Sequence, residues 1–207
     1  MASVDLKRVY PDYTAKHAPA LVTVPPRPHL MVDGHGDPNT SQVYRDAVET
    51  LYPLAYALRA AIKEATGDAY TVMPLEGLWW ADDMSAFSVD DKSSWLWTLL
   101  ICLPDAVVHV PTDDVITQVT LAKQLPAAAR IEQFGDGEAA QVLHVGPFAD
   151  EGPTIEGLHA FIDNRGMRRT GKHHEIYLSD MRRTEPAKLR TIIRQPVGRA
   201  VTGPEGH

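Results

Sequence analysis

The fold is decided by the stretch His173-His174-Glu175-Ile176-Tyr177-Leu178-Ser179-Asp180, which has the pattern of a strand that runs into a turn. Because side chains alternate across a strand, His173, Glu175 and Tyr177 are predicted to share one face. The opposite face carries aliphatic side chains that suit a hydrophobic core. A carboxylate between an imidazole and a phenol suits the wall of a cleft that holds a cation, orients a water or moves a proton. A solvated glutamate on the open face of an antiparallel sheet is the alternative.

Length and composition are those of an ordinary globular protein. The chain has 207 residues, of which 44% are hydrophobic and 23% are charged, enough for one substantial core or two fused half-size modules. No apolar run approaches the roughly 20 residues of a membrane span, and the N-terminus lacks a signal-peptide pattern. Cys102 is the single cysteine, which excludes an internal disulfide. We therefore expect a cytoplasmic protein that does not contact membranes.

The net charge of −7 is unevenly distributed, because residues 165–199 carry ten Lys or Arg against three acids. A basic segment can indicate nucleic-acid binding. Here no aromatic residue is interleaved with the arginines, and no recognition-helix or zinc-finger pattern is present. We interpret the basic residues as solvated turn and edge positions that protect a sheet edge from pairing. The expected partners are small molecules, and the expected state is a monomer or weak dimer.

The first half of the chain contains a proline-rich arm, a helix and a tryptophan-rich hairpin. Residues 1–28 are predicted to be an extended N-terminal arm that cannot build a core. Apolar residues at three- and four-residue spacing predict a helix over 41–65, with Tyr44 on its buried stripe. All four tryptophans lie on a predicted hairpin of strands 70–80 and 95–103. Regular alternation would place Glu76 with Trp80, whereas a bulge at Gly77 would place it with Trp79; both remain open.

The same order of strand, helix, strand and strand occurs twice. The first copy spans 29–36, 41–65, 70–80 and 95–103, and the second spans 141–148, 154–165, 172–178 and 190–197. This order predicts an α+β fold of two pseudo-symmetric modules with antiparallel sheets and a ligand cleft between them. The ligand-binding domain covers 29–207, with module 1 at about 29–111, a linker helix at about 112–125 and module 2 at about 128–200. Glu76 and Glu175 then occupy equivalent strands.

Four segments resemble a known family, the GyrI-like or AraC-effector-type small-molecule-binding proteins, in its stand-alone branch. The resemblance spans roughly residues 20–200, and nothing before residue 29 has the pattern of a DNA-binding helix-turn-helix. The segments are Asp33-Gly34-His35-Gly36-Asp37-Pro38-Asn39-Thr40-Ser41, Pro74-Leu75-Glu76-Gly77-Leu78-Trp79-Trp80, His144-Val145-Gly146-Pro147-Phe148 and His174-Glu175-Ile176-Tyr177-Leu178-Ser179-Asp180.

The resemblance implies a ligand class and a site residue. Drug-sensing effector domains of bacterial transcription activators in this family bind bulky, flat, often cationic aromatic compounds. They stack the ligand on aromatic rings and meet its charge with a buried glutamate, which falls on Glu175 with Tyr177 beside it. Some stand-alone relatives are implied to be hydrolases of strained or electrophilic toxins, including cyclopropane-bearing alkylators.

We therefore predict a cleft in which Glu175 and Tyr177 are the catalytic pair. The predicted function is a multidrug-type binding protein for lipophilic, planar aromatic, often cationic small molecules, because binding needs only aromatic walls and a carboxylate. The alternative is a detoxifying hydrolase with Glu175 as general base. Each good stacking or cation–π contact would contribute about 1–2 kcal/mol to binding. No cofactor or metal is expected, because His174 points away from His173 and Glu175 on a strand and no second His/Asp cluster is evident. The predicted ligand-binding residues are Glu76, Trp79, Trp80, Trp97, Tyr44, Phe148 and His173.

Overall fold

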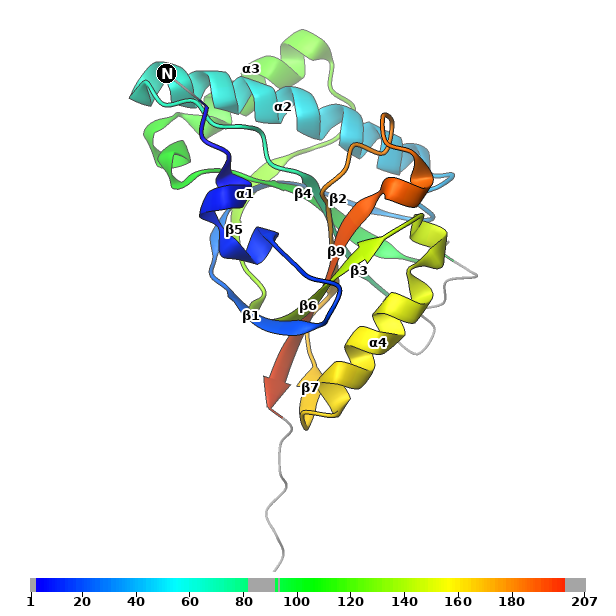
Figure 1. The fold of residues 1–207 in the computed structure, drawn as a ribbon. Coiled ribbons are helices and arrows are strands. Elements are labelled where there is room, and N and C mark those ends of the chain that lie inside the picture. Colours follow the sequence, from blue (N-terminus) through cyan, green and yellow to red (C-terminus); the bar gives the residue numbers. More distant parts are fainter. Residues whose placement is uncertain (1–2, 82–91, 93, 200–207) are drawn as a thin grey trace, which may run out of the picture.

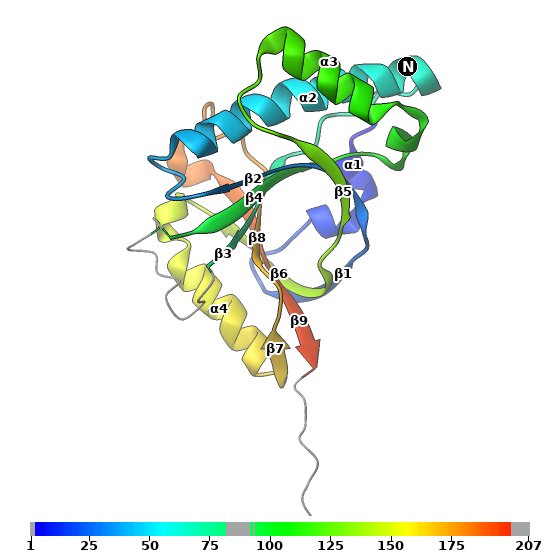
Figure 2. The same cartoon turned by 180° about the vertical axis from the view of Figure 1, so that it is seen from behind.

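A single curled antiparallel sheet forms the centre of the molecule. The structure, a computed structural model, describes residues 3–81, 92 and 94–199. Within those residues, hydrogen bonding links the strands in the order β1-β6-β9-β8-β3-β4-β2-β5, and β7 pairs with β9. Figures 1 and 2 show the sheet curling into a half-barrel, with helices α2 and α4 on its outside.

The predicted repeat of two modules is confirmed in both its elements and its symmetry. In the sheet, β6-β9-β8 of one module meets β3-β4-β2 of the other, so a pseudo-two-fold axis passes between β8 and β3. The first module contains β2 (Arg27–His35), α2 (Gln42–Thr66), β3 (Leu75–Trp80) and β4 (Leu96–Cys102). The second contains β6 (Gly137–Val145), α4 (Gly152–Asp163), β7 (Met167–Arg169), β8 (His173–Tyr177) and β9 (Arg190–Arg199).

Each module also lends a strand to the other. β1 (Ala20–Val24) precedes the first module but pairs with β6, and β5 (Arg130–Phe134) precedes the second but pairs with β2. The two modules are therefore interlocked in one sheet.

The prediction of an extended arm that builds no core is wrong for part of residues 1–28. This segment contains the short helix α1 (Leu6–Val9), the turn η1 (Pro11–Tyr13) and strand β1, and the Leu6 and Tyr13 side chains are buried. Figure 2 shows α1 at the open side of the curled sheet.

The helices cover the outer face of the sheet, which we define as the face that carries Glu175. α2 buries one apolar stripe, including Leu51, Leu54 and Leu58, and ends at Gly67 in the left-handed conformation that favours glycine. α3 (Thr112–Lys123) packs on α2, and α4 packs on β6 and β9. The 3₁₀ turns η2 (Asp105–His109), η3 (Phe148–Asp150) and η4 (Pro186–Lys188) complete the connections.

The inner face of the sheet carries a buried ionic network. His174 lies 3.0 Å from Glu76 through Nε2–Oε2 and 2.8 Å from Asp136 through Nδ1–Oδ2. Arg194 Nη1 donates to Asp136 Oδ2 at 3.1 Å, and the Tyr13 hydroxyl donates to Glu76 Oε1 at 2.6 Å. Burial lowers the pKa of His174, but the Asp136 and Glu76 carboxylates outweigh it and raise the pKa to about 9. His174 is thus an imidazolium that links β8 to β3 and to the turn before β6.

Candidate functional site

Glu175 lies in the middle of the sheet, on β8, where the two modules meet. Its neighbours across the ladders are Gly77 on β3 and Ile193 on β9. Glu175 Oε1 lies 3.0 Å from His173 Nε2, and Oε2 accepts a 2.7 Å hydrogen bond from the Tyr177 hydroxyl. The Glu175 side chain is 14% exposed. The alternation predicted for this strand therefore brings an imidazole, a carboxylate and a phenol into one hydrogen-bonded row.

This row holds a negative charge in an apolar setting. Burial raises the pKa of Glu175, but the hydrogen bond and charge of His173, the Tyr177 hydroxyl and Lys92 outweigh it, so the pKa lies below its usual value. Burial and the adjacent Glu175 charge raise the pKa of Tyr177 well above its usual value. At neutral pH the site therefore contains an ionised carboxylate and a neutral phenol that can donate a hydrogen bond. Such a pair can balance a cation or accept a proton from water.

Aromatic rings lie beside this carboxylate on the outer face. Trp79 folds over Gly77, the residue opposite Glu175, and its buried indole N–H has no hydrogen-bond partner among the described residues. Tyr44 of α2 stacks on Trp79 with ring centroids 6.3 Å apart. From the α4 side, the Phe148 ring meets Tyr177 edge-on at 5.5 Å.

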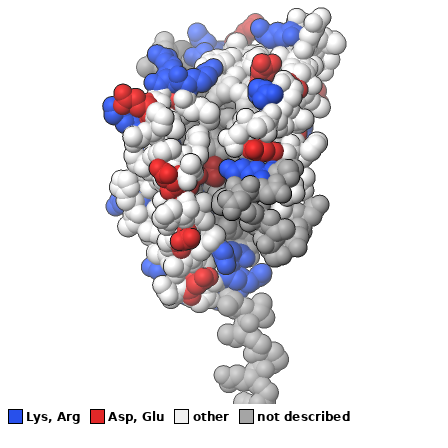
Figure 3. All heavy atoms as spheres, turned by 90° about the vertical axis from the view of Figure 1, so that its right-hand side faces the viewer, with Lys and Arg blue, Asp and Glu red and all other residues white. Residues whose placement is uncertain are grey.

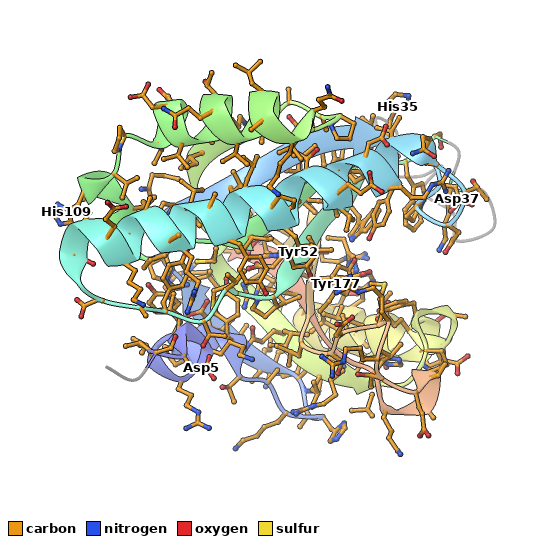
Figure 4. The ribbon with its side chains drawn as sticks, turned by 90° about the horizontal axis from the view of Figure 1, so that it is seen from above. Asp5, His35, Asp37, Tyr52, His109 and Tyr177 are labelled. Atoms are coloured by element: carbon orange, nitrogen blue, oxygen red, sulfur yellow. The ribbon has the colours of Figure 1, made fainter. Side chains whose placement is uncertain are left out.

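A pocket of about 290 Å³ opens beside Tyr177, between α2 and the turn that follows β8. Its wall combines aromatic and aliphatic side chains, and its rim is charged. Seen from above in Figure 4, Tyr52 of α2 and Tyr177 of β8 lie close together. The volume is close to the lower end of small-molecule sites, so the pocket suits one compact aromatic group. The lining residues are Tyr44, Arg45, Val48, Glu49, Tyr52, Leu75, Tyr177, Ser179, Asp180, Met181 and Arg182.

A second buried carboxyl group, that of Glu151, is close enough to feel the Glu175 charge. Glu151 immediately precedes α4, is 4% exposed, and its Oε1 has no hydrogen-bond partner among the described residues. Burial and the Glu175 charge raise the pKa of Glu151 to about 9, although Thr191 and Lys92 oppose the shift. At neutral pH Glu151 is therefore protonated while Glu175 is ionised.

Comparison with known proteins agrees with this architecture. Residues 17–197 match the GyrI-like small molecule binding domain. The chain belongs to the GyrI-like family. A conserved uncharacterised protein from Listeria innocua is 35% identical, with a TM-score of 0.83 and coverage of 95% of this chain and 100% of that one. A hydrolase from Listeria innocua is 34% identical, with a TM-score of 0.81 and the same coverage.

The C-terminal domain of EcmrR shares the GyrI-like fold alone. It is 12% identical, with a TM-score of 0.51 and coverage of 88% of this chain and 98% of that one. No curated protein sequence matches the chain.

Several of the residues predicted for the GyrI-like site lie elsewhere. The β3–β4 ladder runs without interruption through Gly77, so Glu76 and Trp80 share the inner face and Trp79 takes the outer face. Glu76 is 1% exposed and belongs to the network with Tyr13 and His174, which separates it from Glu175.

The remaining tryptophans differ in their surroundings. The ammonium group of Lys172 lies 3.2 Å from the centroid of the Trp80 ring, away from the pocket. Trp97 is on the outer face but is fully buried, and its indole N–H donates to the Gly36 carbonyl at 3.1 Å. Trp97 therefore supports Tyr44 from beneath, with ring centroids 5.4 Å apart.

Sequence reasoning missed Glu151 and Lys92. Glu151 follows the His144-Val145-Gly146-Pro147-Phe148 segment closely and stands at a helix start, a position that usually indicates only a capping role. The one available signal was its proximity in sequence to Phe148.

Three further observations concern metal ligands, membrane helices and the surface charge of the GyrI-like protein. Among the described residues, no three His, Cys, Asp or Glu side chains are grouped so that they could hold a metal ion. None of the described helices is long and apolar enough to cross a membrane. On the face shown in Figure 3, basic and acidic side chains are interspersed, so the described part of that face has no continuous basic surface for nucleic acid.

Proposed function

We propose that this GyrI-like protein is a hydrolase that adds water to an electrophilic aromatic compound bound beside Tyr177, with Glu175 as the general base. The observation that carries the proposal is the Glu175 carboxylate, held ionised by hydrogen bonds from His173 and from Tyr177, which itself lines the aromatic-walled pocket. Cation binding needs only a negative charge there. A carboxylate whose two oxygens are both oriented is better suited to aligning a water molecule. The 34% identity to a Listeria innocua hydrolase over nearly the whole chain supports the proposal.

In this mechanism the ligand's aromatic group occupies the pocket beside Tyr44 and Tyr52. A water molecule between Glu175 and the reactive carbon loses a proton to the carboxylate as its oxygen attacks. His173 fixes the orientation of Glu175, and Tyr177 can turn its hydroxyl toward negative charge that develops on the ligand. General-base catalysis of this kind contributes on the order of 10²–10⁴-fold to the rate. Strained or electrophilic toxins, such as cyclopropane-bearing alkylators, are a suitable substrate class, and the biological role would be detoxification.

A second candidate is a multidrug-type protein that binds planar aromatic cations without changing them. The observation that favours it is the stacking of Tyr44 on Trp79 beside a buried negative charge. A flat cation placed against these rings would gain about 1–2 kcal/mol per contact from stacking and cation–π attraction. Both candidates use the same pocket, so only the fate of the ligand separates them.

The test is an assay that identifies products by mass spectrometry. Wild type, Glu175→Gln and the control Glu64→Gln, an exposed acid of α2 outside the pocket, are incubated with aryl epoxides, cyclopropane-bearing compounds and dye-like cations. We expect wild type and Glu64→Gln to form water adducts and Glu175→Gln to form them at least 10²-fold more slowly. Saturable binding by wild type, with every compound recovered intact, would contradict the hydrolase and favour the binding protein.

A further inference from the structure

The turn before α4 brings a second polar group to the site. In η3, the Phe148 ring packs edge-on against Tyr177 at 5.5 Å. Three residues later, the Glu151 amide donates to the Phe148 carbonyl at 3.2 Å, which fixes Glu151 on the same turn. Thr191, which pairs with Tyr177 across the β8–β9 ladder, also has a buried hydroxyl without a partner among the described residues. Thr191 is close enough to Glu151 to lower the pKa of that carboxyl, although the two make no hydrogen bond of good geometry, so both polar groups lie in one cluster beside Tyr177.

Capping of α4 does not account for Glu151. The residue stands at the N-cap position, yet its side chain makes no hydrogen bond to the first turn of the helix. Its Oε1 is buried and unpartnered, and leaving such a group without a partner costs about 1–3 kcal/mol of stability. A buried carboxyl oxygen without a partner, in a carboxyl that interacts with an ionised carboxylate, calls for an explanation, and a catalytic role is one that accounts for it.

The environments of the two carboxyl groups differ in a way that assigns them different protonation states. Glu175 accepts hydrogen bonds from His173 and Tyr177, which hold it ionised. Burial and the Glu175 charge raise the pKa of Glu151 to about 9 against the opposing effects of Thr191 and Lys92, so Glu151 keeps its proton at neutral pH. A pair of carboxyl groups whose pKa values are pushed apart in this way is the arrangement that acid–base catalysis uses.

We propose that Glu151 is a second catalytic residue, the general acid that protonates the atom released from the attacked carbon. The proposal rests on the hydrolase function proposed above. Water supplies the electron pair for the new carbon–oxygen bond, and one of its protons passes to Glu175. The bond from the carbon to the leaving atom breaks, its electron pair stays on that atom, and the proton of Glu151 joins it. Glu175 is then protonated and Glu151 ionised, and transfer of one proton between them, directly or through solvent, restores the site.

The test compares two probes that differ in their need for a proton. An aryl epoxide releases an alkoxide, which must be protonated, whereas a dinitrophenyl ester of an aromatic acid releases an anion that is stable without one. We expect Glu151→Gln to slow epoxide hydration on the order of 10²–10⁴-fold and to slow ester hydrolysis less than tenfold. The decline of the wild-type epoxide rate as pH rises through about 9 should disappear in Glu151→Gln. Asp150→Asn, which alters the exposed acid next to Glu151, is the control and should match wild type on both probes.

Loss of both activities to the same extent, or of neither, in Glu151→Gln would overturn the assignment while leaving the hydrolase proposal intact. Failure of wild type to convert either probe while binding both would instead overturn the hydrolase proposal, and the role of Glu151 with it. An infrared measurement on wild type is independent of turnover. We expect a protonated-carboxyl stretch at pH 7 that is absent from Glu151→Gln, and its absence from wild type would also overturn the proposal.

Discussion

The buried His174 should make folding stability depend on pH in the alkaline range. His174 is 1% exposed and lies between Glu76 and Asp136, and its pKa in the folded protein is raised to about 9 from 6.5. One pKa unit corresponds to about 1.4 kcal/mol, so the difference corresponds to about 3 kcal/mol of stabilisation. This magnitude agrees with the roughly 3–5 kcal/mol lost when one partner of a buried ion pair is removed.

The sign of the pH dependence follows from the direction of the shift. A group whose pKa is higher in the folded state binds its proton more tightly there, so its contribution is complete below pH 6.5. The contribution falls as pH rises, by at most about 1.4 kcal/mol per pH unit, and is lost above about pH 9.

The assay is urea unfolding followed by tryptophan fluorescence at several pH values between 5.5 and 9.5. The reference is the triple variant His174→Gln, Glu76→Gln, Asp136→Asn, which lacks these three titrating groups of the network. Both proteins keep Glu151, so the titration of Glu151 cancels when the two free energies of unfolding are subtracted. We expect the free energy of unfolding of wild type, minus that of the triple variant, to decrease by about 3 kcal/mol across this range. A difference that stays constant between pH 6.5 and 9 would refute the reasoning.

Three further predictions concern single residues. Gly34→Ala should lower the melting temperature by roughly 2–12 °C, because the added methyl group would overlap the Trp97 ring. Gly157→Ala has open space around it and should raise the free energy of unfolding by up to about 1 kcal/mol. Calorimetry that shows equal effects of the two substitutions would contradict this prediction. Burial and the Glu76 charge raise the pKa of Cys102 to about 12, so a thiol reagent at pH 8 should label Cys102 only after the protein is unfolded in urea. Tyr177→Phe removes a hydrogen bond that lowers the pKa of Glu175, so the acidic limb of the pH–rate profile should move to higher pH. An acidic limb that stays at the same pH would count against Glu175 as the base.

The module repeat could be predicted from the sequence, but the exchange of strands could not. Local periodicity in the sequence indicates the elements of each module, such as the apolar stripe of α2 that includes Leu51, Leu54 and Leu58. β1 and β5 lie at the edges of the sheet and are mostly exposed, so burial along these strands gives no sign of which strand each one pairs with. Their pairing with β6 and β2 depends on how the whole sheet curls, which no local pattern records.

In the site too, local pattern predicts some residues, and others depend on how distant segments pack. Alternation along one strand was sufficient to place His173, Glu175 and Tyr177 together, because the strand itself fixes their spacing. Glu76 was uncertain because a single bulge at Gly77 would have reversed its face, and the uninterrupted ladder turns it inward. Glu151 could not be identified, since its burial arises only when α4 packs on β6 and β9.

The measurement that tests the central claim most directly is a single turnover in water labelled with heavy oxygen, with enzyme in excess over an aryl epoxide. A general base activates water without bonding to the substrate. We therefore predict that the product of the first turnover carries the label and that the peptide containing Glu175 remains unlabelled. A product without the label would mean that an oxygen of the protein attacked the substrate. Label found in the Glu175 peptide after the same turnover would identify that oxygen as belonging to Glu175. Either result would contradict the role of Glu175 as a base.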